Sequence, residues 1–237
     1  MNETIQVLMN RKSVRVFEDK EITPEIKDII LAAAMRAPTG GNCMPYSIID
    51  VTDQSIKDEL AETCDHQPFI AQAKMVLIFC ADYHRWYRKF KMAGCEDIPA
   101  PELSNMVLAT EDAVIAAHTA CIAAESLGIG SCYIGDIVEN FEIHKELLNL
   151  PPQVAPLCML VFGYPTQQQK ERKQTTRFAK SSIVFENRYR ELSEEELLEM
   201  MPNDRTKAFY NRKYVSEFAQ EMVRSTKEIY KNWNSKE

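Results

Sequence analysis

The chain has 237 residues, of which 45% are hydrophobic and 27% are charged. This composition is typical of a folded globular protein and excludes the disordered and collagen-like classes. Its 28 basic and 35 acidic side chains give a formal net charge of -7. A nucleic-acid binder usually carries a basic excess, so DNA and RNA are not expected as partners. A chain of this length buries roughly 70% of its surface on folding, so its core needs no disulfide or structural metal.

Sequence features also indicate the cellular compartment in which the protein is expected. The longest wholly apolar run is Met75 to Ala81, far shorter than the roughly 20 residues of a membrane-spanning helix. We therefore expect no transmembrane segment, and the first 15 residues lack the pattern of a secretion signal. The seven cysteines are odd in number and irregularly spaced, unlike a secreted disulfide framework. Cys80 and His84 lie four residues apart, but no second pair completes a metal site. We expect a cytoplasmic, metal-free protein with reduced thiols.

Two helices stand out in chain order. Thr23 is a favourable N-cap and Pro24 a favourable first residue for a helix that Pro38 ends. A stronger helical pattern covers residues 103–127 and ends at a glycine. This second helix is apolar around most of its surface, which predicts a central position. Within it, we expect His118 to be a hydrogen-bonded core histidine.

Short, partly β-branched runs predict the strands. They cover residues 46–52, 75–81, 157–163 and 182–186. Strands separated by helices favour a layered α+β or α/β domain.

The basic and aromatic stretch 84–91 and the proline-containing loop 97–101 are expected to form a wall or lid over a pocket for aromatic substrates. After residue 192 the chain becomes strongly polar, with apolar residues at helical spacing. The sequence thus predicts a main domain, 1–192, and a helical extension, 193–237, that packs on the outside or on a partner subunit.

The first of three candidate motifs is Arg11-Lys12-Ser13-Val14-Arg15. Its guanidinium groups and hydroxyl at alternate positions can converge on a phosphate. A solvated basic turn is the alternative.

The second motif, residues 37–42, is a loop of small residues after a helix. It can bring backbone N–H groups and the Asn42 amide close to a flat ligand, although an ordinary turn has the same composition. The third, residues 128–135, holds three of the seven glycines. Either close approach of a ligand or a helix end followed by a strand accounts for them.

In their order and residue types, these motifs resemble the nitroreductase family of FMN-dependent oxidoreductases over nearly the whole chain. Residues 162–165 (Phe-Gly-Tyr-Pro) and 184–189 (Val-Phe-Glu-Asn-Arg-Tyr) are most similar to its oxygen-insensitive NADPH nitroreductase and flavin reductase group. The resemblance implies a nitroreductase-like α+β fold: a central, mostly antiparallel sheet flanked by helices, with a C-terminal helical extension. It also implies a homodimer with FMN at the subunit interface.

The resemblance assigns one set of residues to the FMN phosphate or ribityl chain: Arg11, Lys12, Ser13, Arg15 and Arg177. A second set would approach the flavin from the other subunit: Pro38, Thr39, Gly40 and Asn42. Gln67 would hydrogen-bond the ring, and Ile134 and Gly135 would place backbone groups beside the reactive N5. The flavin carries the chemistry, so no side chain is expected to be a catalytic residue.

Two departures from the family pattern concern this site. The family group has Lys-Pro-Arg where this chain has Thr175-Thr176-Arg177, and Lys173 or Arg172 is the candidate to replace the missing lysine. Asp136 stands where the family has a second glycine. An acid near the flavin would oppose negative charge on the reduced ring.

The activity that the resemblance implies is ping-pong transfer of hydride from NAD(P)H to a nitroaromatic, quinone or flavin acceptor. Two alternatives are a non-catalytic flavin-binding or carrier protein and a family member specialised for an enone or a halogenated aromatic. The choice between NADH and NADPH is left open by the sequence.

Overall fold

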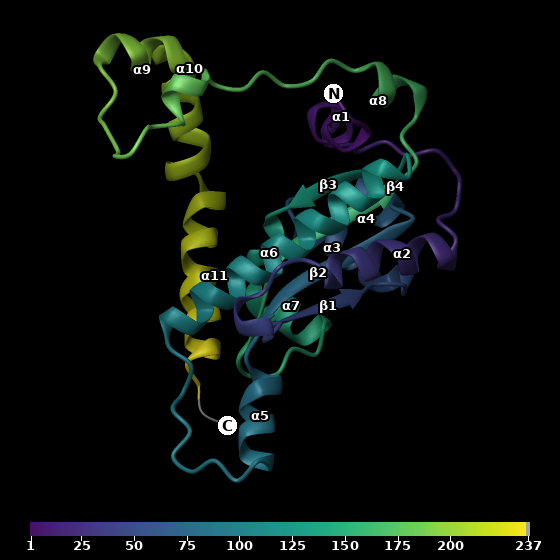
Figure 1. Ribbon diagram of the computed structural model, residues 1–237, viewed down its shortest axis with the longest axis vertical. Helices are drawn as coiled ribbons and strands as arrows, with labels where there is room; N and C mark the ends of the chain where they lie inside the picture. The colour runs from purple at the N-terminus through teal and green to yellow at the C-terminus, as the bar shows by residue number, and fades with distance from the viewer. Residues whose placement is uncertain (236–237) are drawn as a thin grey trace. The chain divides into compact units, whose positions relative to one another are not determined.

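A four-stranded antiparallel sheet forms the centre of the computed structural model, which describes residues 1–235 (Figure 1). Its strands are β1 (Tyr46–Asp50), β2 (Met75–Asp82), β3 (Gly130–Ile134) and β4 (Val154–Gly163). They lie in the order β1-β2-β4-β3, and each neighbouring pair is antiparallel. Three strand spacings, roughly 14 Å in total, therefore separate the edge strands β1 and β3.

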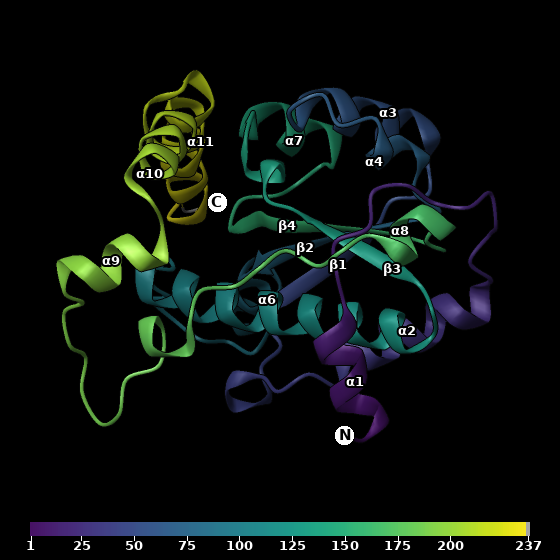
Figure 2. The ribbon, with the colours of Figure 1, turned by 90° about the horizontal axis from the view of Figure 1, so that it is seen from above.

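Helices cover both faces of this sheet. Figure 2 shows α2 (Pro24–Met35) and α6 (Leu103–Ser126) on one face, and α3 (Gln54–Thr63), α4 (Phe69–Gln72) and α7 (Phe141–Leu147) on the other. Each face has its own hydrophobic core cluster. The layered α+β class predicted from the sequence is confirmed.

The central strand β2 is apolar at nearly every position because both of its faces are buried. Leu77 and Phe79 belong to the cluster under α2 and α6, and Val76, Ile78 and Cys80 belong to the cluster on the other face. Burial on both faces produces the continuous apolar run from which this strand was predicted. The strands predicted at 46–52 and 157–163 are confirmed by β1 and β4.

The two predicted helices are also confirmed. α2 begins at Pro24, and the hydroxyl of its N-cap Thr23 accepts a hydrogen bond from the Ile26 N–H at 3.4 Å. α6 runs for 24 residues. Just beyond its end, Gly128 has a φ of 75°, a conformation that favours glycine.

By length and hydropathy alone, α6 could cross a bilayer, a feature that a search for one continuous apolar run did not detect. Its alanine-rich face packs on the sheet. The buried residues of that face are Ala109, Ala113, Ala116, Ala117, Ala120 and Ala124. This packing is that of a core helix in a globular domain.

The prediction that His118 is a core histidine is wrong. His118 is exposed on α6, whereas His144 on α7 is fully buried. Large apolar side chains are also exposed on α6, among them Val107 at 50% and Val114 at 42%. Because apolar residues surround most of α6, the sequence pattern could not identify which face meets the sheet.

Further helices of the first compact unit, residues 1–172 and 224–235, are α1 (Glu3–Asn10), α5 (His84–Met92) and α8 (Gln167–Glu171). Short 3-10 turns cover Gly40–Asn42 and Asp136–Val138.

Residues 173–223 cluster as a second compact unit. It contains a 3-10 turn (Lys180–Ser182), α9 (Glu194–Met200), α10 (Asn203–Tyr210) and a π-helical turn (Asn211–Val215). The last helix, α11 (Glu217–Trp233), begins in this unit and ends in the first. The helices predicted for the polar tail are confirmed.

The strand predicted at 182–186 is absent from the described residues. Ser182 ends the 3-10 turn, and Ile183 and Val184 are exposed at 62% and 57%. A strand requires a partner for its backbone hydrogen bonds, and this segment has none within residues 1–235.

The segment that follows α1 lies against β3 and β4. It can approach this closely because the strands have glycine, which lacks a Cβ atom, at the two contact positions. The Val14 N–H donates to the Ser131 carbonyl at 2.8 Å. A Cβ atom on Gly130 would lie 2.5 Å from Val14 Cγ2, and one on Gly163 would lie 2.6 Å from the Phe17 ring. Gly130 therefore serves contact between two parts of the chain, which the sequence analysis did not foresee.

Candidate functional site

The basic motif lies along β3. Ser13 forms an isolated parallel bridge with Ser131. Burial raises the pKa of the Cys132 thiol, while the Arg15 charge and hydrogen bonds from Ser13 and Arg15 act in the opposite direction. The hydroxyl and guanidinium of this motif thus gather around the middle of β3.

The first two residues of the motif face the end of α6. Burial raises the pKa of the Glu125 carboxyl, and the charges of Arg11 and Lys12 oppose this shift. Glu125 Oε2 is buried without a hydrogen-bond partner among the described residues. Lys12 and Glu125 both line a cavity of about 260 Å3. This end of β3 is therefore a small recess with the Glu125 carboxyl and Lys12 in its wall.

Lys12 and Arg172 connect the motif to the residues around α8. Lys12 Nζ donates to the carbonyls of Lys170 and Arg172 at 2.7 and 2.6 Å. The Arg172 guanidinium donates to the Ser13 carbonyl. Lys12 is thus engaged within the chain, and Arg172 is a cation beside the motif. Arg172 was one of two candidates for the missing lysine; the other, Lys173, belongs to the second unit.

Gln67 lies beside the far end of β3 and is bonded to Asp136. Its Nε2 donates to Asp136 Oδ2 at 2.5 Å and to the Cys64 carbonyl at 2.8 Å. Both amide hydrogens are therefore used within the chain, and the carbonyl oxygen Oε1 is the atom left to accept a bond from a ligand. Ile134 and Gly135 directly precede Asp136. A Cβ on Gly135 would meet nothing within 4 Å, so its backbone has open space beside it.

The small-residue loop is bound to α6 by Asp112. The Thr39 hydroxyl donates to Asp112 Oδ2 at 2.5 Å, and the Gly40 N–H donates to the same carboxylate at 3.2 Å. This N–H is thus not available to a flat ligand, contrary to our expectation for the loop. Asn42 is exposed with a φ of 56°, and its side-chain amide has no partner among residues 1–235.

The predicted site residues form two groups in this chain. One group lies along β3 and at its ends: residues 11–15, Gln67, Ile134 and Gly135. The other group, Pro38 to Asn42, directly precedes β1 at the opposite edge of the sheet. Arg177 lies in the second compact unit.

The first group fits a phosphorylated, flat cofactor such as FMN. Guanidinium groups and a hydroxyl are the donors that a dianionic phosphate requires. The recess beside Lys12 and Glu125 and the open backbone at Gly135 leave room at both ends of β3. By contrast, the described residues contain no cluster of three metal-ligating side chains.

A buried histidine, His144, hydrogen-bonds to residues next to the Gln67–Asp136 pair. His144 Nδ1 lies 2.9 Å from the Ile137 carbonyl and donates to it, because a carbonyl oxygen can only accept. The other ring nitrogen, Nε2, lies 2.8 Å from the Thr63 hydroxyl. Ile137 follows Asp136, and Thr63 ends α3 just before Cys64. His144 thus joins the two backbone segments that carry the pair. Sequence reasoning missed this residue, and no local motif around it indicates the role.

The fold and this geometry define a layered α+β protein with a basic segment beside an edge strand. The model of the Nitroreductase family matches residues 8–164. The chain is 34% identical to FMN reductase (NADPH) of Bacillus subtilis, with 80% of this chain and 75% of the relative covered. It is 33% identical to the oxygen-insensitive NADPH nitroreductase of Salmonella typhimurium, with 82% and 78% covered.

A solved structure gives the same result. The NADPH:FMN oxidoreductase of Vibrio harveyi, complexed with NAD+, has a TM-score of 0.81 and 28% identity to this chain, with 97% of this chain and 98% of that one covered. The chain belongs to the nitroreductase family.

We expect His144 to make stability depend on pH. Burial lowers the pKa of His144 below its ordinary value of 6.5, so the unfolded chain binds more protons as the pH falls below about 6.5. The free energy of unfolding should therefore fall between pH 7.5 and 5.5, by at most about 1.4 kcal/mol per pH unit for this one proton. Urea unfolding of the wild type and of His144→Gln measures the effect, and the variant should show the weaker dependence. Parallel pH profiles would contradict this.

Proposed function

We propose that the chain is an FMN-dependent oxidoreductase that transfers hydride from NAD(P)H to nitroaromatic, quinone or flavin acceptors. The observation that carries the proposal is the cationic segment, residues 11–15, held along β3 by the Val14 bond to Ser131. Membership of the nitroreductase family and similarity to an FMN reductase and an NADPH nitroreductase support it. FMN, when bound, supplies the two-electron chemistry at N5.

In this proposal the residues of the chain bind and orient the cofactor. Arg11, Ser13 and Arg15 grip the phosphate, and Arg177 completes the cluster; Arg172 adds a cation beside Ser13. Lys12 acts indirectly, because its ammonium is bonded to two backbone carbonyls.

The ring end of the cofactor would meet neutral groups. Gln67 presents its Oε1 to an N–H of the ring, since both of its amide hydrogens are engaged. Ile134 and Gly135 present backbone groups. The Asp136 charge is partly offset by the Gln67 amide that donates to it, which weakens its opposition to negative charge on the ring.

A second copy of the chain would complete the site. Pro38, Thr39, Gly40 and Asn42 lie at the opposite edge of the sheet from Ile134, so in the proposed homodimer they approach the partner's flavin. The exposed apolar side chains of α6 are the surface on which the partner would pack: Leu103, Val107, Leu108, Val114 and Ile115. We further propose that residues 193–237 pack on the partner and that the protein is cytoplasmic; its seven cysteines are free thiols.

Replacing Arg15 and Arg177 together with alanine should largely abolish FMN retention. Each charge-assisted contact with a phosphate contributes about 1.5–3 kcal/mol. The FMN released per chain on denaturation and the FMN dissociation constant measure the loss. The pair Lys20→Ala and Arg88→Ala removes the same charge elsewhere and should retain FMN. Undiminished FMN affinity in the Arg15/Arg177 variant would reject the phosphate assignment.

Placing acids on the exposed face of α6 should separate the subunits. Val107→Glu with Val114→Glu would bury two charges in an interface expected to exceed about 1,600 Å2. Sedimentation velocity should then show a monomer that has lost FMN. Ile143→Glu is the control, because α7 lies on the other face of the sheet and Ile143 is 46% exposed. A stable, FMN-loaded monomer of the wild type would overturn the shared site.

Steady-state kinetics test the activity itself. If the oxidised nicotinamide, NAD(P)+, leaves before the acceptor enters the same pocket, double-reciprocal plots at several quinone concentrations should be parallel. Intersecting lines would contradict the shared pocket. An absence of NAD(P)H oxidation in FMN-loaded protein would favour the carrier alternative.

A further inference from the structure

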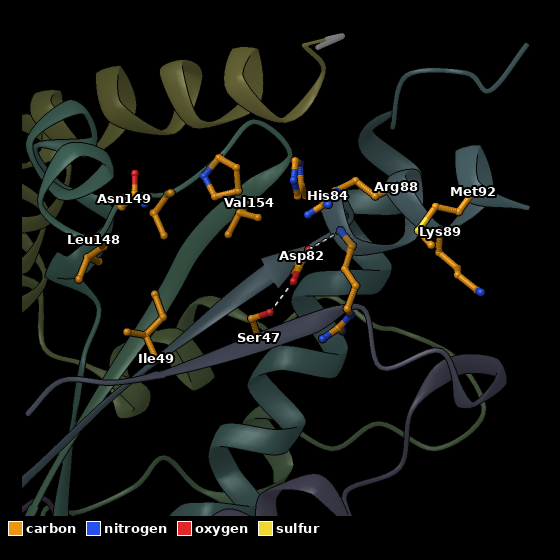
Figure 3. A pocket seen from close by; sticks show the side chains of 13 residues that line it. Ser47, Ile49, Asp82, His84, Arg88, Lys89, Met92, Leu148, Asn149 and Val154 are labelled. Carbon is orange, nitrogen blue, oxygen red and sulfur yellow. Dashed lines mark hydrogen bonds between the residues drawn. The ribbon is translucent and has the colours of Figure 1, made fainter.

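A cavity of about 470 Å3 lies at the β1 side of the sheet (Figure 3). Its walls come from β1, the end of β2, α5 and the loop between α7 and β4. Its volume falls within the range of small-molecule sites, about 300–1,000 Å3. The described residues that line it include none of those assigned to FMN, so it is a separate site.

One part of the cavity is apolar. Figure 3 shows Ile49, Leu148 and Val154 grouped on the side away from α5. Leu150 and Pro151 add to the same wall. An apolar wall of this kind favours a ligand with a hydrocarbon body, because contact removes apolar surface from water.

The α5 side of the cavity is basic. Arg88 and Lys89 are exposed there, and neither side chain has a hydrogen bond or ion pair with any residue from 1 to 235. Arg85 differs, because its guanidinium donates to the Met44 and Tyr46 carbonyls at 2.5 and 3.0 Å. Figure 3 shows the Arg88 side chain directed toward the cavity and the Lys89 side chain directed away from it, as expected for consecutive residues of a helix. Arg88 is therefore the cation without a carboxylate partner that faces the cavity, and it favours an anion there.

Asp82 does not neutralise these cations. It is buried, and the Ser47 hydroxyl and the Arg85 backbone N–H, the latter at 3.1 Å, donate to its carboxylate (Figure 3). Its charge is thus satisfied by neutral donors of the chain, and the charge of Arg88 is left for a ligand.

We propose that this cavity binds a small aromatic carboxylate. The ring lies on the wall of Ile49, Leu148 and Val154, and the carboxylate binds Arg88, since a guanidinium matches a carboxylate with two parallel hydrogen bonds. The proposal does not depend on the flavin assignment, because the two sets of residues do not overlap.

Calorimetric titration with 2-naphthoate tests the ligand class. The protein saturated with FMN should bind one 2-naphthoate per chain in this cavity, and occupancy should leave the visible absorbance of the flavin unchanged. The neutral analogue 2-naphthalenemethanol has the same ring and should bind at least tenfold more weakly. Equal affinity for the two probes, or no binding of 2-naphthoate, would overturn the proposal.

A pair of variants tests the location. Arg88→Gln with Lys89→Gln should raise the dissociation constant for 2-naphthoate at least tenfold. Lys20→Gln with Arg36→Gln removes the same charge from other exposed positions and should bind as the wild type does. All four side chains are exposed, so urea unfolding should show equal stability. Wild-type affinity in the Arg88/Lys89 variant, or binding that shifts the flavin spectrum in every variant, would assign the ligand to another site.

Discussion

The contact between Val14 and Gly130 is the constraint on which the candidate site depends. A Cβ at position 130 would lie 2.5 Å from the Val14 side chain, so the backbone of residues 13–15 can reach β3 only if residue 130 is glycine. The Val14 bond to Ser131 then sets the register of the basic motif along the strand. Without this register, Ser13 and Arg15 would belong to a solvated turn. The distinction between a basic turn and an anion site is therefore made by a residue that carries no charge.

The position of this motif has a second consequence. β3 is an edge strand, and its outer edge is bonded to residues 13 and 14 instead of to another strand of the sheet. An unpaired strand edge readily pairs with other chains. The basic segment therefore covers an edge of the sheet that would otherwise be open, as well as presenting its side chains, and one local interaction serves both the stability of the sheet and the proposed site.

Much of the fold could be predicted because buried strands and helix starts have recognisable sequence patterns. β2 and β4 are covered on both faces and appear as apolar runs, and Thr23-Pro24 starts a helix by local chemistry alone. The segment 182–186 has the composition of a strand but no partner in the chain, and composition does not reveal pairing. The prediction that His118 is buried was wrong for a related reason. On a helix that is apolar all round, position in the sequence does not identify the buried face.

The motifs of the candidate site could be recognised in sequence, but their contacts could not. The bonds from Lys12 to the carbonyls of residues 170 and 172 join positions about 160 residues apart in the chain. Asp112 gave one usable signal, since a buried carboxylate in an alanine-rich helix requires donors. Those donors proved to be Thr39 and Gly40.

The bond between Gln67 and Asp136 couples the chemistry of two positions. An amide side chain is chemically two-sided, and its neighbour decides which side faces outward. Here Asp136 takes an amide hydrogen and turns residue 67 into an acceptor. In a chain with glycine at 136, the same glutamine would be free to turn and donate. A substitution at position 136 therefore changes whether residue 67 offers a donor or an acceptor, and a ligand at this end of β3 would meet the two residues as one group.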